Sequence, residues 1–204
     1  MAKISTYPSN TDINANDLLI GTDSEDSNAT KNHSIGSIDT YIKTNLGLGV
    51  TQVLTGSSIS NQEPSGLDAA LQVEFGAAQG SGVDPVQLSV VGAITFNQEG
   101  LYLFNGFGNF ERQGASGGDT VTAFRALING AQVGYTKMVE LDKVGIAIPY
   151  ETTIPLSVSV GDVLTWEIIR DSSGIDAGGL YTHTLLSSWS NIPSASFTVW
   201  RVGV

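Results

Sequence analysis

From Leu67 onward, short apolar segments alternate with clusters of Gly, Asp, Asn and Pro. Segments of this length and spacing are typical of the strands of a β-sandwich or jelly roll. No part of this region has the three- and four-residue apolar spacing of a long helix. The pattern predicts an all-β head, an antiparallel jelly-roll sandwich. Its strands are expected at residues 71–75, 86–96, 100–110, 120–130, 144–160, 162–170 and 195–204.

Several of these strands are apolar on both faces. After Gly100, large apolar side chains occupy both alternating rows, the one that begins at Leu101 and the one that begins at Tyr102. A monomeric antiparallel sandwich usually has one polar face, so the second apolar face predicts cover by another subunit. Loops of the same chain are the alternative cover. We expect self-association, with Tyr102, Phe104 and Trp200 in contact with a neighbouring chain.

The first 47 residues have a different pattern. An apolar burst is followed by fourteen residues, Gly21 to Ser34, that contain no large apolar side chain, and then by a second apolar cluster with three- and four-residue spacing. This pattern predicts a strand-like piece, a polar loop and a short helix that Ser37 caps and Gly47 ends. The two clusters consist of Leu18, Leu19 and Ile20, and of Ile35, Ile38, Tyr41 and Ile42.

The apolar residues of these two clusters are too few to form a core of their own. They therefore need a surface that another molecule supplies. We therefore expect residues 1–47 to be a small anchoring arm that contains a short helix. A flexible tail is the alternative. Residues 48–66 are rich in Gly and Ser and are expected to be a linker, which leaves residues 67–204 for the head.

Charge and composition limit the classes of partner and of chemistry that we expect for this chain. The net charge is −11, with nine Lys and Arg among 204 residues, so nucleic acid is not an expected partner. Cysteine is absent, which excludes disulfides and thiolate chemistry. No apolar run approaches the ~20 residues that cross a bilayer, and the N-terminus lacks a secretory pattern. We expect a chain that is made soluble and does not insert into membranes.

Candidate chemistry is sparse. The two histidines, His33 and His183, have no neighbours in the spacing of a triad or metal site. No catalytic residue, cofactor or metal is therefore expected, and the chain is not expected to be an enzyme. A glycan hydrolase would need two acids in one cleft. The acids considered for that role are scattered along the sequence: Glu111, Glu140, Glu151 and Glu167.

Four motifs in a fixed order resemble the jelly-roll trimers of the tumour necrosis factor and complement globular-head superfamily. They cover roughly two thirds of the chain, and their order is more specific than any one of them. The resemblance implies a homotrimer whose last strand lies near the threefold axis. The motifs are "ITFNQEGLYLFNGFGNF" (94–110), "FRALINGAQVG" (124–134), "LSVSVGDVLTWEII" (156–169) and "SASFTVWRV" (194–202).

Other segments are similar to structural proteins of tailed bacteriophages. They are "NDLLIGTDSEDSNATKNHSIGSIDTYI" (16–42), "LQVEFGAAQG" (71–80) and "EIIRDSSGIDAGGL" (167–180). This resemblance implies a virion protein made in the host cytoplasm, a short trimeric fibre. Residues 1–47 would dock on other virion proteins, and the head would contact a host surface glycan or protein. A capsid decoration or tail adaptor without receptor binding is the alternative.

Host contact is expected on loops, because the strands form the core and the subunit interface. The turns at residues 112–119 and 170–184 are rich in small and polar residues. Because the chain is acidic, binding would rest on short-range contacts, on calcium bridging or on avidity. The candidate receptor residues are Arg112, Asp119, Asp171, Asp176, Tyr181 and His183.

Overall fold

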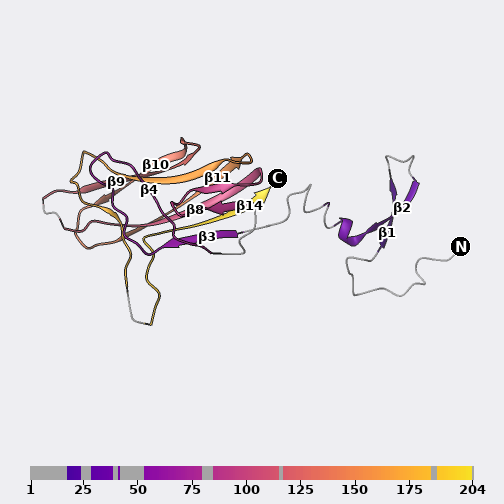
Figure 1. The fold of residues 1–204 in the computed structure, drawn as a ribbon, viewed down its shortest axis with the longest axis horizontal. Helices are drawn as coiled ribbons and strands as arrows, with labels where there is room; N and C mark the ends of the chain where they lie inside the picture. The colour runs from indigo at the N-terminus through magenta and orange to yellow at the C-terminus, as the bar shows by residue number, and fades with distance from the viewer. Residues whose placement is uncertain are drawn as a thin grey trace. The chain divides into compact units, whose positions relative to one another are not determined.

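The computed structural model describes residues 18–23, 29–38, 41, 53–79, 85–114, 117–184 and 188–203 (Figure 1). The chain divides into two compact units, one up to Gly49 and one from Val50 to Gly203, and we describe each by itself. No helix within the described residues is both long and apolar enough to cross a membrane.

The N-terminal unit contains a β-hairpin. Its strands β1 (Leu18–Asp23) and β2 (Ala29–Ser34) pair antiparallel, with Thr22 opposite Thr30. The prediction of a loop from Gly21 to Ser34 was therefore wrong for residues 21–23 and 29–34, which lie on the two strands. The predicted short helix begins directly after β2, and residues 35–38 are helical.

The cap of this helical turn also differs from the prediction. The backbone N–H of Ser37 donates to Oγ of Ser34 at 3.0 Å, and the two hydroxyl groups are 2.7 Å apart. Ser34 therefore occupies the capping position, three residues before the N–H that it satisfies. Ser37, which the sequence suggested as the cap, lies inside the first turn.

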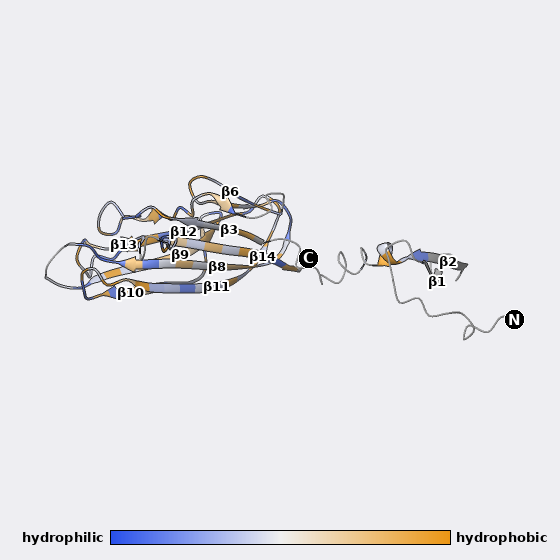
Figure 2. Ribbon diagram, turned by 90° about the horizontal axis from the view of Figure 1, so that it is seen from below, coloured by the Kyte–Doolittle hydropathy of each residue, from blue (hydrophilic) through white to orange (hydrophobic). Residues whose placement is uncertain are grey.

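The larger unit is a sandwich of two six-stranded antiparallel sheets, which confirms the predicted jelly roll (Figures 1 and 2). The first sheet has the order β10-β9-β12-β7-β6, with β4 paired to β12; its strands are β4 (Leu71–Gln72), β6 (Val86–Leu88), β7 (Ile94–Phe96), β9 (Thr120–Ile128), β10 (Ala131–Leu141) and β12 (Val163–Arg170). The second has the order β11-β8-β14-β3-β5, with β13 paired to β8; its strands are β3 (Val53–Ser58), β5 (Ala78–Gln79), β8 (Gly100–Glu111), β11 (Ile148–Val158), β13 (Gly179–Leu180) and β14 (Ala195–Gly203).

Strand β3 lies inside residues 48–66, which the sequence suggested as a linker. It pairs with β14 over six residues, from Ala195 opposite Ser58 to Trp200 opposite Val53, and Leu54 is buried in the core. The segment "VLTGSS" contains only two large apolar residues, so its alternation was too weak to predict a strand. Residues 53–66 belong to the sandwich.

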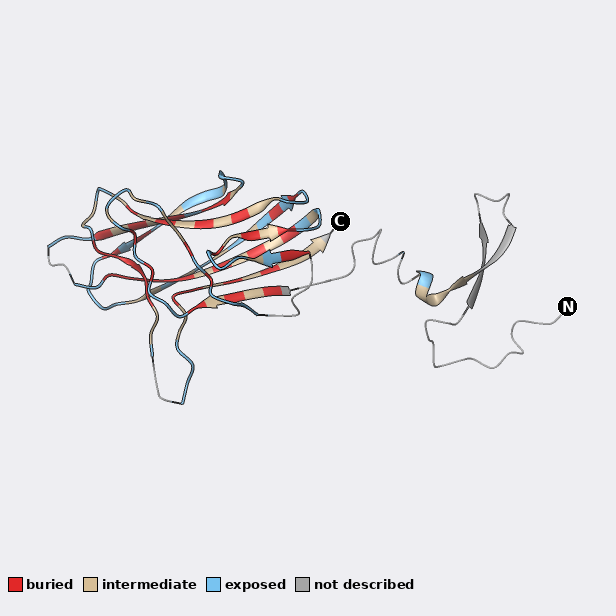
Figure 3. Cartoon of the chain, viewed as in Figure 1, coloured by how far each residue is buried: buried red, intermediate tan, exposed pale blue. Residues whose placement is uncertain are grey.

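Buried residues recur along the strands of both sheets (Figure 3), and aromatic side chains are prominent among them. Trp166 is stacked on Phe75 with ring centroids 5.9 Å apart and meets Phe124 edge-to-face at 5.3 Å. Gly108 allows Trp166 to approach β8, because a Cβ there would lie 3.2 Å from the Trp166 ring and 2.9 Å from both Leu180 and Phe110. The alternation of large and absent side chains along β8 therefore serves core packing.

The sandwich has two ends. At the entry end, β3 begins and β14 finishes. At the far end, β8, β10 and β12 finish and β9, β11 and β14 begin. The connections at residues 112–119, 142–147, 171–178 and 181–194 all lie at the far end. The strand ends that they join lie opposite the end where β3 begins.

Two turns at the entry end contain Asn, Gly and Asp residues of the quoted motifs. Asn129 and Gly130 adopt φ values of 50° and 80° between β9 and β10, as a two-residue hairpin of this type requires. The second turn joins β11 to β12 and contains Asp162. Nδ2 of Asn129 donates to Oδ1 of Asp162 at 2.8 Å, so the two turns are bonded to each other.

Candidate functional site

Two of the three residues predicted to contact a neighbouring chain lie inside their own sandwich. Tyr102 and Phe104 are fully buried in the core, where Tyr102 donates from its hydroxyl to the carbonyl of Gln98 at 3.0 Å. Both belong to the inward row of β8, so a direct contact with another subunit is excluded. This part of the prediction was wrong because alternation separates two rows without saying which one faces the partner sheet.

The outward row of β8 and β14 carries the exposed apolar surface instead. Trp200 lies opposite Leu103, and Leu101 lies two residues away in the same row. Leu101 is exposed, and Leu103 and Trp200 are half-buried. We call these three residues the outer-face patch. The predicted contact of Trp200 with a neighbour stays a prediction that this placement allows.

A second apolar surface lies at an edge of the sandwich. Strands β10 and β11 are the edge strands of the two sheets on this side, and a bulge interrupts β10 between Val133 and Lys137. Tyr135 and Met138 are 83% and 64% exposed, and Tyr135 and Pro155 line a hollow of about 330 Å³ between the strands. We call Tyr135 and Met138 the edge patch; Pro155 lies opposite Leu103 on β8 and therefore adjoins the outer-face patch.

Neither edge strand is suited to pairing with a further strand. The bulge in β10 disrupts its regular row of hydrogen-bonding groups, and Lys137 lies beside it. Pro149 and Pro155 remove two backbone donors from β11. Bulges, prolines and lysines at sheet edges prevent edge-to-edge association. The edge therefore offers side chains, not backbone, to a partner.

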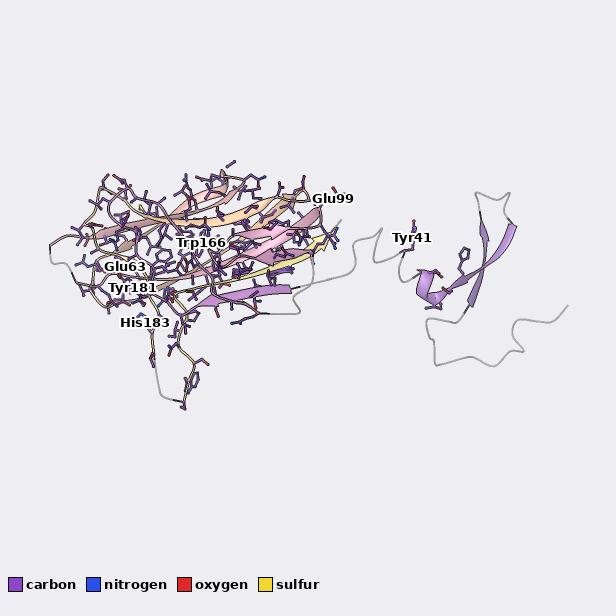
Figure 4. All side chains as sticks on the ribbon, viewed as in Figure 1. Tyr41, Glu63, Glu99, Trp166, Tyr181 and His183 are labelled. Carbon is purple, nitrogen blue, oxygen red and sulfur yellow. The ribbon has the colours of Figure 1, made fainter. Side chains whose placement is uncertain are left out.

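At the far end, polar contacts hold the loops together, in the region where Figure 4 labels Glu63, Tyr181 and His183. Arg170 is 6% exposed and donates to the Gly178 carbonyl at 2.5 Å, to Oδ1 of Asp176 at 2.9 Å and to Oε2 of Glu63 at 3.3 Å. Burial raises the pKa of Tyr181 above its ordinary value, and a hydrogen bond to Glu63 raises that pKa further. Arg170 therefore joins the end of β12 to the segment after β3.

Glu111 and His183 form a second polar contact at this end. Oε2 of Glu111 lies 2.5 Å from Nε2 of His183, and Glu111 is 2% exposed. Gln113 donates to the other carboxylate oxygen at 3.3 Å. Because a buried carboxylate needs a partner, His183 fixes the start of the β13–β14 connection to the end of β8.

The predicted receptor residues lie together at the far end but have different roles. Arg112 is buried and donates to the carbonyls of Gly118 and Leu141, and Tyr181 is 2% exposed. Neither can meet a receptor directly, so these two predictions were wrong: a polar loop sequence does not reveal which side chains turn inward. Asp119 is exposed and His183 is half-buried.

Bridging by calcium, through Asp171 and Asp176, was one of three possibilities for host binding, and both acids are bonded within the chain. Asp171 accepts hydrogen bonds from the backbone and hydroxyl of Ser173, which lower its pKa, and Asp176 pairs with Arg170. Each acid therefore has a protein partner of its own. No three acidic or histidine side chains among the described residues are grouped so that they could hold a metal ion.

Trp189 is a feature that the sequence reasoning missed. It is 67% exposed in the β13–β14 connection, whose stem leaves the body of the sandwich (Figure 1). The stem is ordered by hydrogen bonds between His183 and Ile192 and between Thr182 and Ile192. A tryptophan flanked by serines in a polar segment was the available signal.

A hollow of about 170 Å³ lies on the outward face of β9 and β12. We call it the β9–β12 hollow. Arg125 and Glu167 form an ion pair within it at 2.9 Å. Glu167 stood among the scattered acids in the sequence, and only the strand register places Arg125 opposite it. The described lining includes Ala70, Ala123, Arg125, Thr136, Glu167 and Ile169.

The predicted anchor residues are placed only in part. Leu18, Leu19 and Ile20 lie on β1, Ile35 and Ile38 are half-buried on the helical turn, and Tyr41 is 62% exposed. Ile42 lies outside the described residues. Their docking on another protein stays a prediction.

No family model and no curated protein matches the sequence. Among solved structures, the chain is similar to the globular domain of a zebrafish complement 1qA protein. The TM-score is 0.45 and the sequence identity 12%, over 74% of this chain and 98% of that one. A likeness at this level identifies neither a family nor a function.

Proposed function

We propose that the chain is a non-enzymatic structural protein of a virus particle, a short fibre that assembles as a homotrimer through its sandwich. It is made soluble in the host cytoplasm and joins the particle through the N-terminal unit. The far end of the sandwich contacts the host surface. The observation that carries the proposal is the presence of two different apolar patches on one sandwich, the outer-face patch and the edge patch.

Two unlike patches favour a ring. When one patch of a chain binds the other patch of the next chain, the interface is heterologous, and a rotation that closes gives a cyclic oligomer. Trp200 and Tyr135 are the aromatic residues of the two patches, and aromatic residues are enriched in the buried parts of interfaces. The number three comes from the resemblance of the sequence motifs to jelly-roll trimers.

The arrangement of the ends supports the direction of the fibre. The chain enters the sandwich at the entry end, where β3 begins, and four connections gather at the far end. A protein that is attached through its N-terminal segment would therefore present the far end outward. Loops at such an end can vary without disturbing core or interface.

Light scattering on the full chain tests the assembly. The expected mass is three times the chain mass of 21.4 kDa. Trp200→Ser and Tyr135→Ser should each give monomers, whereas Val90→Ser, which changes an 89% exposed residue outside both patches, should leave the trimer intact. A mixture of the two monomeric variants should form a dimer, because each variant retains the patch that the other lacks.

A monomeric unmodified chain at micromolar concentration would contradict the proposed ring. Two monomeric variants that do not combine would contradict the heterologous interface. Binding of the trimer to susceptible cells tests the host-contact role separately. A trimer that incorporates into particles but binds no susceptible host would indicate a capsid decoration or tail adaptor instead.

A further inference from the structure

We propose that the β9–β12 hollow binds one neutral saccharide unit through two adjacent hydroxyl groups. This inference rests on the proposed host-contact role and names the chemistry of the ligand. It assigns the ligand to the side of the sandwich, on the outward face of the first sheet. The far-end loops would then lie next to the host surface, and the sugar would bind in the β9–β12 hollow.

Small side chains create the hollow. Ala123 on β9 lies opposite Ile169 on β12, and Arg125 lies opposite Glu167. Ala70, from the segment before β4, lies on the rim. The volume of about 170 Å³ is below the roughly 300–1,000 Å³ of pockets that enclose drug-sized ligands. One sugar ring fits this scale, and a longer glycan would extend into solvent.

The ion pair leaves Oε1 of Glu167 and the N–H groups on Nη1 of Arg125 for a ligand. Nε and Nη2 of Arg125 both donate to Oε2 of Glu167, at 3.1 and 2.9 Å. Oε1 of Glu167 and Nη1 of Arg125 make no hydrogen bond to any described residue. Because Arg125 and Glu167 are bonded to each other, the ion pair limits where Oε1 and the N–H groups of Nη1 can lie before a ligand arrives.

Adjacent hydroxyl groups of a sugar match this arrangement. One hydroxyl donates to Oε1 of Glu167, and its neighbour accepts from Nη1 of Arg125. Thr136 adds a hydroxyl group at the wall, where it donates to the side-chain oxygen of Gln132 at 3.3 Å. The methyl groups of Ala70 and Ala123 and the side chain of Ile169 offer contact to the C–H face of the ring.

Charge favours an uncharged ligand. Arg125 and Glu167 neutralise each other, so the hollow has no net charge for an anionic sugar to meet. The chain as a whole carries −11, which repels anionic ligands at distances within the screening length. A neutral hexose avoids this repulsion. Its affinity would be weak at one site, on the order of 1 mM, and avidity across several subunits would strengthen it.

Titration of the full chain with methyl glycosides of glucose, galactose and mannose, followed by NMR, tests the inference. At least one glycoside should saturate the protein in the millimolar range. Ala123→Val fills the hollow without removing a polar group, and Glu167→Gln removes the carboxylate, so each should weaken binding at least tenfold. Glu140→Gln removes an exposed acid from the neighbouring strand β10 and should leave binding unchanged.

The inference is overturned if no glycoside binds, or if Ala123→Val binds as tightly as the unmodified chain. Light scattering and cell binding by the same proteins distinguish this failure from that of the proposed function. Cell binding that survives Ala123→Val would place the host contact elsewhere while the proposed function stands. If the unmodified chain forms no trimer, or binds no susceptible cells, the proposed function itself is contradicted.

Discussion

At the scale of single residues, the role of a side chain depends on partners that are distant in the sequence. Glu111 belongs to the end of β8 and His183 to the connection after β13, yet their side chains meet at 2.5 Å. The pattern around each residue contains no sign of the other. The sequence therefore could not identify the carboxylate that the side chain of His183 contacts.

Replacement of His183 by Ala should destabilise the sandwich, because it leaves the buried carboxylate of Glu111 without the side chain that contacts it. Loss of one partner of a buried polar pair costs about 1–3 kcal/mol of unfolding free energy. Urea unfolding of the full chain measures this change. His33→Ala, at the only other histidine, is the control and should leave the unfolding of the sandwich unchanged. Equal stability of His183→Ala and the unmodified chain would show that Glu111 finds another partner.

At the scale of elements, alternation and turn residues predicted most of the sandwich but not its inner face. The apolar segments that follow Gly100 and Asp162 in the sequence form strands β8 and β12 in the structure. Asn129 and Gly130 form the hairpin turn between β9 and β10. Strands β2 and β3 were missed because their few large apolar residues leave no alternation to detect. The inward row of β8 is defined by the facing sheet, which a single strand cannot reveal.

The contact between the Asn129 and Asp162 turns should make stability depend on pH. The backbone N–H of Ser159 and then the side chain of Asn129 lower the pKa of Asp162 below its ordinary value. Because the pKa is lower in the folded chain, this contribution is fully present above the unfolded value of about 3.9. It is lost as the pH falls through that value toward the lower folded pKa.

Urea unfolding between pH 6 and pH 2.5 measures this contribution. The difference in stability between the unmodified chain and Asp162→Asn should shrink as the pH falls below about 4. Asp142→Asn, at an exposed acid of the β10–β11 turn, is the control for the general effect of removing one charge. A difference that stays constant over this range would show that Asp162 contributes through its shape and not through its charge.

At the scale of the whole molecule, the proposed site depends on surfaces that no single element carries. Trp200 and Leu103 become neighbours through the pairing of β14 with β8, and Arg125 and Glu167 through the pairing of β9 with β12. The sequence indicated an apolar second face and an acidic chain, which are properties of composition and period. It could not predict the hollow, because a hollow exists only between strands whose register is known.

The division into two units predicts that the N-terminal unit is dispensable for folding of the sandwich. Its described residues form a local hairpin and a helical turn, whereas the core of the sandwich is built from residues between Leu54 and Val199. A chain without residues 1–49 should therefore unfold at nearly the same temperature as the full chain and keep its trimeric mass. It should no longer copurify with particles.

In the full chain, Ile35→Ser together with Ile38→Ser should also abolish copurification, because these half-buried residues are proposed to bind the particle. A large fall in melting temperature on truncation would show instead that the N-terminal unit contributes to the stability of the sandwich. Truncated trimers that still join particles would move the anchor to the sandwich itself.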